Sequence, residues 1–287
     1  MRLLSPLLII QSSLGKAGST HMPSAGSVVA ASHTSPLDVL YLATILDPIF
    51  TQSYPGTKLV RPISLQAALM SCFTAPVLVP PPASQLTTLT AITAQNPNRI
   101  TVVFPEATPS NGRAILTLTP ALLSASPRTK IYPVSLRYTP ADIVTPLPGL
   151  APALHFVWTL LSSSTHCIRT RIGAVVRNPP ADAVASSKGS INGAANRAGR
   201  ANSATSSSSS GGGGGYESNY FDTLAASARD EDMRPDEDGL VEPERKVLDM
   251  VADSLARLGR VKRVGLGVRE KARFVDVWRR GSRARRQ

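Results

Sequence analysis

The sequence predicts an α/β protein in which helices flank a sheet, and three observations favour this class. Short apolar runs of strand type alternate with stretches of helical character. Hydrophobic residues make up 42% of the 287 residues, which is enough for a core, although aromatic residues make up only 5%. From residue 181 to about residue 218 the composition shifts to Ala, Ser, Asn and Gly, with an unbroken glycine run at 211–215. We therefore expect a folded part interrupted by a flexible linker.

The first predicted elements surround a histidine. Residues 1–26 have no clear period and are expected to form a poorly ordered leader, whereas residues 27–32 form a short apolar run of strand type that leads into His33. The sequence Ser35-Pro36-Leu37-Asp38 then opens a helix, because serine is a good N-cap, proline suits the first helical position and aspartate falls at the third. This helix is expected to end at Asp47-Pro48.

The remaining elements complete the layered pattern. Apolar or β-branched runs and helical stretches follow in turn along the chain, with strands expected at 58–63, 100–104, 131–137 and 168–176 and helices at 64–72 and 83–95. After the linker, residues 242–258 carry apolar side chains on one helical face, and Gly259 suits a C-cap. Residues 264–268 look like a strand. We divide the chain into a leader, a core at 27–180, a linker at 181–240 and a C-terminal piece at 241–287 that packs on the core and ends in a basic tail.

Charge and cysteine content limit the partners. The net charge is +12, and residues 257–287 contain twelve Lys or Arg and two acidic residues, so this segment carries ten of those charges. Such a segment binds anionic membranes or nucleic acid, or is a solvated tail. No nucleic-acid recognition module accompanies it, so we expect no nucleic-acid partner. Cys72 and Cys167 give no disulfide framework and no metal-ligand spacing, which favours a reducing compartment.

Membrane contact is expected at the surface. No run of about 20 apolar residues is present, so no conventional spanning helix is encoded. Residues 147–161 are apolar and include Phe156 and Trp158, which fits an interfacial segment with both aromatic rings in the headgroup layer. Residues 3–10 form a shorter apolar stretch that is compatible with the remnant of an anchor or a poor signal peptide.

The first chemical motif is His33-Thr-Ser-Pro-Leu-Asp38. A histidine with an ordinary pKa near 6.5 is the natural base for removing a proton from a hydroxyl group near neutral pH. A carboxylate that holds the other ring nitrogen fixes the tautomer and stabilises the imidazolium, and Asp38 is within plausible reach. The alternative is purely structural, since an aspartate in the first turn of a helix is favoured by the helix dipole.

The second motif is Phe104-Pro-Glu-Ala-Thr-Pro-Ser-Asn-Gly-Arg113. It follows a predicted buried strand, so Glu106 lies where ligands bind in open α/β sheets, at the carboxyl end of a strand. Thr108, Ser110 and Asn111 supply short donors and acceptors, and Arg113 supplies a guanidinium that suits phosphate. The alternative is a proline-bounded turn with polar groups at the surface.

The two motifs together resemble the glycerophospholipid acyltransferases, which move a fatty acyl group from coenzyme A to a lysophospholipid or glycerol phosphate. In that family the histidine–aspartate motif comes first, the Pro-Glu motif follows, and then comes an apolar strand with a proline. This chain has the same order, with the strand at residues 131–138. The amino-acid sequence of residues 258–267, together with Lys271, Phe274 and Trp278, is similar to that of a fungal branch of the family that acylates lysophosphatidic acid. The resemblance covers residues 27–178 and 241–280.

The resemblance implies a mixed sheet flanked by helices, in a fold like that of glycerol-3-phosphate acyltransferase, with an insertion before the C-terminal piece. It implies acyl-CoA-dependent transfer to lysophosphatidic acid in phospholipid or triacylglycerol synthesis, with acyl-CoA as co-substrate and neither cofactor nor metal. His33 would be the base and Asp38 its partner, and substrate would be bound by Glu106, Thr108, Ser110, Asn111 and Arg113. No activated serine or cysteine accompanies His33, so no covalent acyl-enzyme is implied. We expect a membrane-associated protein at the cytosolic face of the endoplasmic reticulum or a lipid droplet; the oligomeric state stays open.

Two positions depart from the family pattern. Ala107 replaces the usual glycine, and Pro109 replaces an arginine that the resemblance assigns to phosphate binding, for which Arg113 is the expected substitute. The family also has a block with an arginine between the two motifs, and this block is not clearly present here. Lys58 and Arg61 are the only nearby candidates, and both are expected to be solvated surface residues. These departures leave an alternative open, in which the chain is a catalytically weakened relative that acts as a lipid-binding or membrane scaffold protein.

Overall fold

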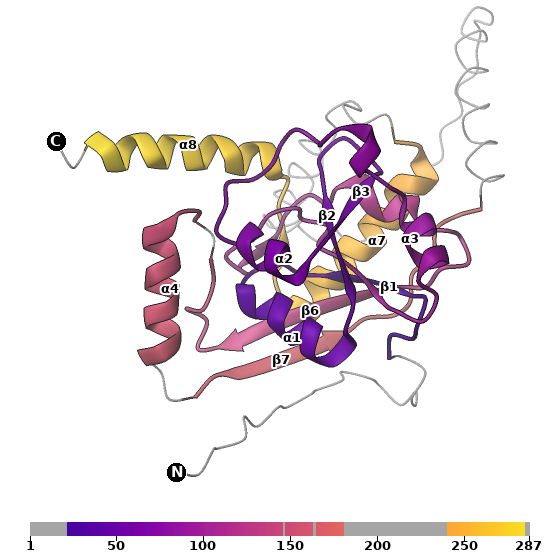
Figure 1. Cartoon of the computed structure of the whole chain (residues 1–287), viewed down its shortest axis with the longest axis horizontal. Helices are drawn as coiled ribbons and strands as arrows, with labels where there is room; N and C mark the ends of the chain where they lie inside the picture. The colour runs from indigo at the N-terminus through magenta and orange to yellow at the C-terminus, as the bar shows by residue number, and fades with distance from the viewer. Residues whose placement is uncertain (1–21, 146, 163–164, 181–239, 285–287) are drawn as a thin grey trace, which may run out of the picture. The chain divides into compact units, whose positions relative to one another are not determined.

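The structure is a computed structural model that describes residues 22–145, 147–162, 165–180 and 240–284. Figure 1 shows a six-stranded sheet in the order β3-β2-β4-β1-β6-β7 with helices packed around it. The predicted α/β class with a mixed sheet is confirmed. The elements are β1 Val28–Ala31, α1 Pro36–Leu46, β2 Ile49–Ser53, β3 Val60–Ile63, α2 Leu65–Ser71, the 3₁₀ turn η1 Ala83–Gln85, α3 Leu89–Gln95, β4 Thr101–Val103, β5 Ala114–Ile115, the 3₁₀ turn η2 Pro120–Ser124, β6 Ile131–Thr139, α4 Leu150–Ser162, β7 Cys167–Ile172, α7 Glu242–Gly259, β8 Lys262–Arg263 and α8 Val268–Ala284.

The four central strands of the sheet run parallel to one another. β1 pairs with β4 on one side and with β6 on the other, and β4 also pairs with β2. The outer strands β3 and β7 are antiparallel to their neighbours. All four residues of β1 are fully buried, as expected for a parallel strand covered on both faces. The carboxyl ends of β1 and β4 therefore lie side by side, and the two motifs leave the sheet at this edge.

Helix α1 begins as the sequence predicts. Ser35 is the N-cap, its hydroxyl accepts a hydrogen bond from the amide of Leu37, and Pro36 is the first helical residue. Asp38 closes a capping box by accepting from the amide of Ser35. The helix ends at Asp47, whose φ of 41° is left-handed.

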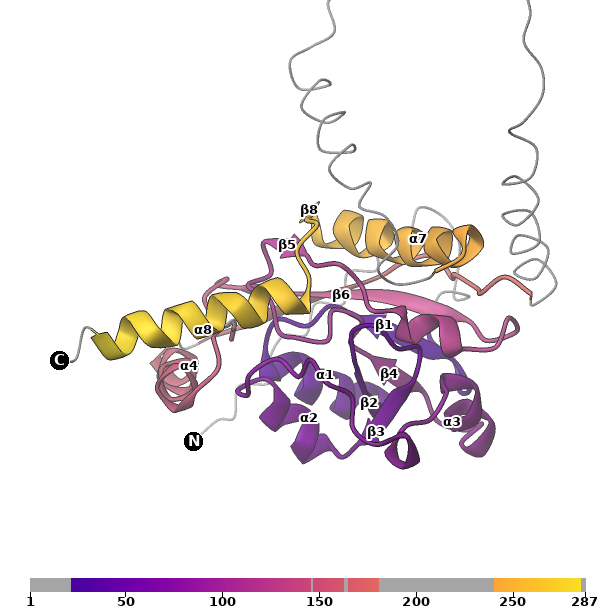
Figure 2. The same cartoon turned by 90° about the horizontal axis from the view of Figure 1, so that it is seen from above.

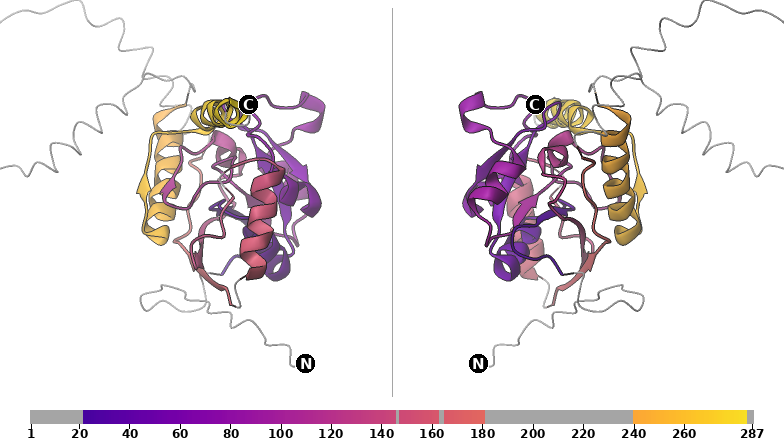
Figure 3. Two further views of the ribbon diagram at one scale, coloured as in Figure 1. Left: turned by 90° about the vertical axis from the view of Figure 1, so that its left-hand side faces the viewer. Right: turned by 90° about the vertical axis from the view of Figure 1, so that its right-hand side faces the viewer.

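Two layers cover the sheet, as Figures 2 and 3 show. On one face, α1 and α2 enclose a core with alternate residues of the central strands, including Val29, Val102 and Val134. On the other face lies α7, whose buried side chains are Glu244, Val247, Leu248, Val251, Ala252, Leu255 and Gly259. A side chain at Gly259 would meet the hydroxyl of Ser135 at 3.3 Å, so glycine here permits close packing on β6. The predicted C-cap was therefore misplaced by one residue: Gly259 is still helical, and Arg260 adopts the left-handed φ of 50°.

Four further elements differ from the prediction. The expected helix over 83–95 is divided into η1 and α3, because Thr87 pairs with Val60 as an isolated bridge and Thr88 caps a new helix. Strand β2 was not predicted. The strand expected over 264–268 was placed too far along the chain: β8 is Lys262–Arg263, its hydrogen bonding to the segment around β5 continues to Leu266, and a helix, α8, begins at Val268. The sequence of α8 is mainly polar, so its helical period was obscured by charge.

The expected leader and linker are largely beyond what the structure describes. Residues 1–21 and 181–239 lie outside the described ranges, and these residues make up most of the predicted leader and linker.

None of the helices within the described ranges combines the length and the apolar character that crossing a membrane requires. Helix α4 covers most of the expected interfacial segment, but Phe156 is buried and packs on Phe73 at 6.0 Å between ring centroids. Only Trp158 of the two expected aromatic residues is exposed.

Candidate active site

His33 follows β1 directly and is fixed by both motifs. Its ring stacks on Phe104, with centroids 4.3 Å apart and an interplanar angle of 23°. Its backbone carbonyl accepts a hydrogen bond of 2.7 Å from the amide of Ser110. Its own amide points to the Oε1 atom of Glu106 at 3.4 Å. The end of β1 and the loop after β4 are thus tied together around the imidazole, which is only 4% exposed.

The ring nitrogens of His33 have unequal surroundings. Nε2 lies 3.2 Å from Sγ of Cys72, which is the last residue of the α2 turn. The thiol of Cys72 in turn points to the carbonyl of Ala68 at 3.6 Å. If the thiol proton is directed to this carbonyl, Nε2–H donates to the sulfur, and Nδ1 keeps the lone pair. Nδ1 is buried and has no hydrogen-bond partner within the described part of the chain. In this tautomer, Nδ1 is the ring atom that carries the lone pair.

The cysteine was not expected at this position. We predicted that no activated serine or cysteine accompanies His33, but we did not foresee that the last turn of α2 brings a thiol from 39 positions away against the ring. Burial raises the pKa of the Cys72 thiol to about 12 and lowers the pKa of His33 from 6.5 to about 3, with a further lowering by the positive charge of Lys271. Both groups are therefore neutral, unlike a thiolate–imidazolium pair.

Asp38 is buried close to His33, but the structure gives it other hydrogen-bond partners. Its Oδ2 atom accepts from the amides of Thr34 at 2.6 Å and Ser35 at 2.9 Å and from the Thr34 hydroxyl at 3.0 Å. Its Oδ1 atom accepts from the hydroxyl of Tyr138 at the end of β6. Burial raises the pKa of Asp38 from 3.8 to about 6, while the hydrogen bonds from Tyr138, Thr34 and Ser35 oppose that rise. In this structure Asp38 shapes the loop that carries His33 and does not hold the ring itself.

Glu106, in the second motif, also holds the loop that carries His33. Its side chain is fully buried, and its two oxygens accept from the amides of His33 at 3.4 Å and Leu116 at 3.2 Å. Burial raises its pKa from 4.5 to about 7, although both amides act to lower it. Glu106 therefore joins the His33 loop to the segment after the second motif, and it is not among the residues that line the pocket.

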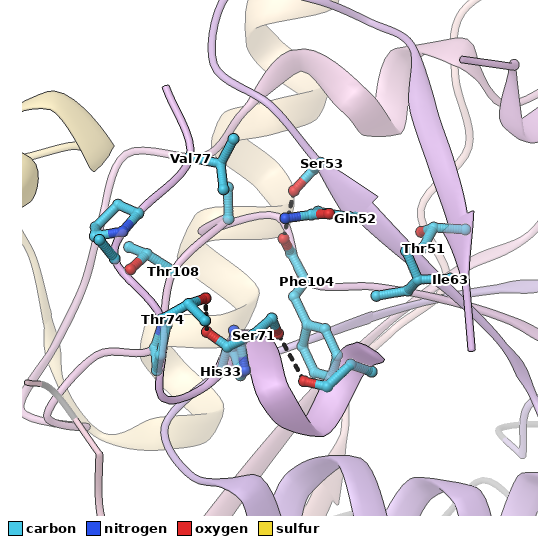
Figure 4. A pocket seen from close by; sticks show the side chains of 15 residues that line it. His33, Thr51, Gln52, Ser53, Ile63, Ser71, Thr74, Val77, Phe104 and Thr108 are labelled. Carbon is cyan, nitrogen blue, oxygen red and sulfur yellow. Dashed lines mark hydrogen bonds between the residues drawn. The ribbon is translucent and has the colours of Figure 1, made fainter. Parts of the chain in front are cut away.

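A pocket opens beside His33 and holds about 460 Å³ of empty space, part of which is continuous with solvent. Figure 4 shows the labelled side chains that surround it, with Phe104 and Ser71 near the histidine and Thr108 and Val77 at another side. Thr108 is 2% exposed, and its hydroxyl has no hydrogen-bond partner among the described residues. The second motif thus contributes backbone and one unsatisfied hydroxyl to the wall of this pocket.

The other predicted binding residues are arranged less favourably. Ser110 is buried, but its hydroxyl accepts from the amide of Gly112. Asn111 is exposed and accepts from the amide of Arg113 at 3.0 Å, which forms a local turn. Arg113 is exposed as well, and it does not line the pocket. Lys58 forms an ion pair of 2.6 Å with Glu244.

A cation reaches the site from α8 instead. The ammonium group of Lys271 donates a hydrogen bond to the carbonyl of Pro109, 162 residues away in the sequence. Burial lowers the pKa of Lys271 from 10.5 to about 8, whereas Glu106 and Cys72 act to raise it. Lys271 appeared in the sequence only as part of a resemblance, and no local pattern distinguishes it from the other basic residues of the tail. Across the described ranges no three His, Cys, Asp or Glu side chains gather as a metal site would require.

Ala107 has an unusual backbone conformation, with a φ of 52°. This left-handed region suits glycine and strains a residue that carries Cβ. The resemblance assigns a glycine to this position, which is the residue that this conformation suits. Ala107 also lines the pocket, where its methyl group takes up space.

A neutral histidine between the ends of two parallel strands, with one free ring nitrogen and a neighbouring pocket, is suited to taking a proton from a hydroxyl group. Residues 15–137 match the family model described as Acyltransferase. The match includes both motifs and ends before Tyr138 and Lys271.

A candidate lysophosphatidic acid:oleoyl-CoA acyltransferase from Schizosaccharomyces pombe is 32% identical to this chain over 149 residues. The aligned part covers 52% of this chain and 49% of the relative. The chain thus spans about half the length of the curated relative that it matches.

Proposed function

We propose that the protein transfers a fatty acyl group from acyl-CoA to the free hydroxyl of a lysophospholipid, with lysophosphatidic acid as the preferred acceptor, in phospholipid or triacylglycerol synthesis. The observation that carries this proposal is the buried, unpartnered Nδ1 atom of His33 beside the pocket. The family match and the name of the fission yeast relative support the reaction class.

In the proposed reaction, Nδ1 of His33 takes the proton of the acceptor hydroxyl as its oxygen attacks the thioester carbonyl. The new C–O bond forms, the C–S bond breaks, and the coenzyme A thiolate leaves and recovers the proton from the imidazolium. Asp38 acts through the loop that it shapes and through its negative charge when ionised. Glu106 holds the backbone of His33, and Thr108 offers its free hydroxyl to substrate.

The acyl chains require a path to lipid, and apolar side chains provide one. Val77 lines the pocket, and the adjacent Val79 is 76% exposed. Helix α4 presents a stripe at a spacing of three to four residues, made of Leu150, Leu154, Val157, Trp158 and Leu161, all of them exposed. Figures 1 and 2 place α4 on the same side of the molecule as α8, which exposes Phe274 and Val277 and carries arginine residues.

We infer from this surface that the protein binds a membrane interface through α4 and α8, with cytosolic leaflets of the endoplasmic reticulum or lipid droplets as the proposed site. Binding to liposomes that contain anionic lipid is expected to fall when Trp158 and Leu161 are both replaced by glutamate, because apolar burial is lost and repulsion is added. A matched control is Met250→Glu, which adds one exposed charge on α7. Unchanged sedimentation of the double variant with liposomes would contradict this surface assignment.

The test of the activity is transfer from labelled oleoyl-CoA to a panel of lysophospholipids. His33→Ala is expected to lose about 10²- to 10⁴-fold in rate, the usual contribution of a general base. His155→Ala is the control, because His155 is exposed and lies away from the apolar stripe of α4. Equal activity of wild type and His33→Ala would exclude His33 as the base.

One observation favours the alternative of a lipid-binding or scaffold protein. Burial lowers the pKa of His33 and makes it a weak base, and Asp38 accepts hydrogen bonds from Tyr138 and from the Thr34 and Ser35 amides rather than from the ring. Lipid binding by a wild-type protein that transfers no acyl group would support this alternative, whereas acceptor-dependent turnover would exclude it.

A further inference from the structure

The C-terminal segment is fixed to the second motif by backbone hydrogen bonds. Strand β8 pairs in parallel with β5, which follows the motif, and Ala114 lies opposite Lys262. The ladder continues beyond the strands, where Val264 donates to the carbonyl of Ile115 and Thr117 donates to the carbonyl of Leu266, both at 3.0 Å. The segment that leads into α8 is therefore held to the chain just after the pocket wall.

The first turns of α8 direct one lysine inward. Glu270 caps the helix by accepting from the amide of Gly267 at 2.8 Å. Val268 and Val275 are buried at 4% and 1% exposure, and Lys271 lies between them on the same helical face at a spacing of three and four residues. This face packs on the core, so the lysine side chain is carried to Pro109 rather than into solvent.

Among the described residues the ammonium group at Pro109 forms no ion pair, although the negative charge of Glu106 acts on it from farther away. Its hydrogen bond goes to a neutral carbonyl, and burial lowers the Lys271 pKa to about 8. Next to Pro109, the hydroxyl of Thr108 is buried, lines the pocket and has no partner within the described ranges. The half-buried ammonium group of Lys271, which contacts Pro109, and the unsatisfied hydroxyl of the preceding Thr108 lie at one wall of the pocket. Together they match the needs of a phosphate group, which accepts several hydrogen bonds and carries negative charge.

We propose that Lys271, together with Thr108, binds the phosphate group of a substrate at the pocket wall formed by the second motif. The proposal rests on the proposed function only in naming this ligand as a reactant. The acceptor phosphate and the phosphates of coenzyme A are two sources of the same chemistry. Neither lysine nor arginine lines the pocket itself, but Lys271 contacts the lining residue Pro109, whereas Arg113, the substitute that the sequence suggested, is exposed.

The experiment compares acceptors with and without a phosphate group, and donors with and without the phosphate-bearing nucleotide of coenzyme A. Lysophosphatidic acid is compared with monoacylglycerol, and acyl-CoA with the acyl thioester of pantetheine. Lys271→Met keeps the aliphatic stem but removes the charge, Lys271→Arg keeps the charge, and Lys262→Met removes an exposed lysine from the same segment. We expect Lys271→Met to lose about 10- to 100-fold in kcat/KM with the phosphate-bearing reactant, as for one charge-assisted hydrogen bond, and to change little with its phosphate-free counterpart.

In wild type, kcat/KM is expected to differ between a phosphate-bearing reactant and its phosphate-free counterpart. The pair, acceptors or donors, whose difference disappears in Lys271→Met identifies the source of the phosphate. Lys271→Arg is expected to retain part of that difference. An equal loss with all four reactants, or no loss, would overturn the proposal. Calorimetric binding of glycerol 3-phosphate, with glycerol as reference, tests the site without turnover. If the wild type transfers no acyl group but binds glycerol 3-phosphate through Lys271, the proposed function fails and the phosphate site stands. If binding is the same in wild type and Lys271→Met and no turnover is seen, both fail.

Discussion

His33 is expected to stay neutral over the pH range in which an exposed histidine titrates. Burial lowers its pKa from 6.5 to about 3, with a smaller effect from Lys271. At about 1.4 kcal/mol per pKa unit, this difference corresponds to roughly 5 kcal/mol against protonation in the native state. At pH 5 an ordinary histidine would be roughly 3% neutral, whereas His33 would be about 99% neutral.

Nitrogen NMR of the imidazole rings measures this protonation directly. The signals of His33 are those missing from His33→Gln, and the same protein unfolded in urea gives the reference titration. The native signals are expected to remain those of a neutral ring from pH 8 to pH 5. A native midpoint between pH 6 and pH 7 would refute the argument, because it would show that the ring is solvated or ionically paired in the folded protein.

The same shift has a consequence for stability. Below pH 6.5 the unfolded chain binds a proton at His33 that the native state excludes, so the free energy of unfolding falls by about 1.4 kcal/mol per pH unit until the native pKa near 3. Asp38 and Glu106 act in the opposite direction, since their raised pKa values let the native state bind protons first as the pH falls below about 6 and 7. Comparison with His33→Gln at each pH isolates the histidine, and equal slopes for the two proteins would contradict the burial argument.

Three further substitutions test other contacts of the site. Cys72→Ala is expected to keep the acyl-transfer rate within about tenfold if the thiol only sets the tautomer, whereas loss of more than about 10³-fold with an acyl adduct on Cys72 in wild-type mass spectra would indicate a covalent route. Tyr138→Phe removes the donor to buried Asp38 and should lower the free energy of unfolding in urea by about 1–3 kcal/mol; an unchanged value would show that the carboxyl group does not need it. Ala107→Gly relieves a left-handed residue and should raise this free energy by about 0.5–1 kcal/mol, and a decrease would show that the turn is not strained.

The beginning of the site could be predicted because its signals are local. Ser35, Pro36 and Asp38 specify a helix start within four residues, and the apolar run before Phe104 specifies a buried strand. The parallel arrangement of these strands then brings the two motifs to one sheet edge. The sequence also indicated that Asp38 could cap the helix. It did not indicate the hydrogen bond from Tyr138 to Asp38, because that contact depends on the register of β6.

The contacts that were missed are made by distant segments. Cys72 meets His33 because α2 packs beside α1, and neither its spacing nor its neighbours in the sequence indicate this contact. Lys271 is one of several basic residues in a polar segment, and its inward direction follows from the pairing of β8 with β5. Arg113 was preferred because it is close to Pro109 in sequence, but a local turn at Asn111 leaves it exposed.

The pairing of β5 with β8 also determines when the site can be complete during synthesis. His33, Cys72, Glu106 and Thr108 are translated early, and the strands that support them can pair before the end of the chain exists. Lys271 reaches Pro109 only after residues 262–271 have left the ribosome and β8 has joined β5. A chain interrupted before this point would hold the base without the cation. Completion of the C-terminal segment is therefore the last step in the maturation of the pocket.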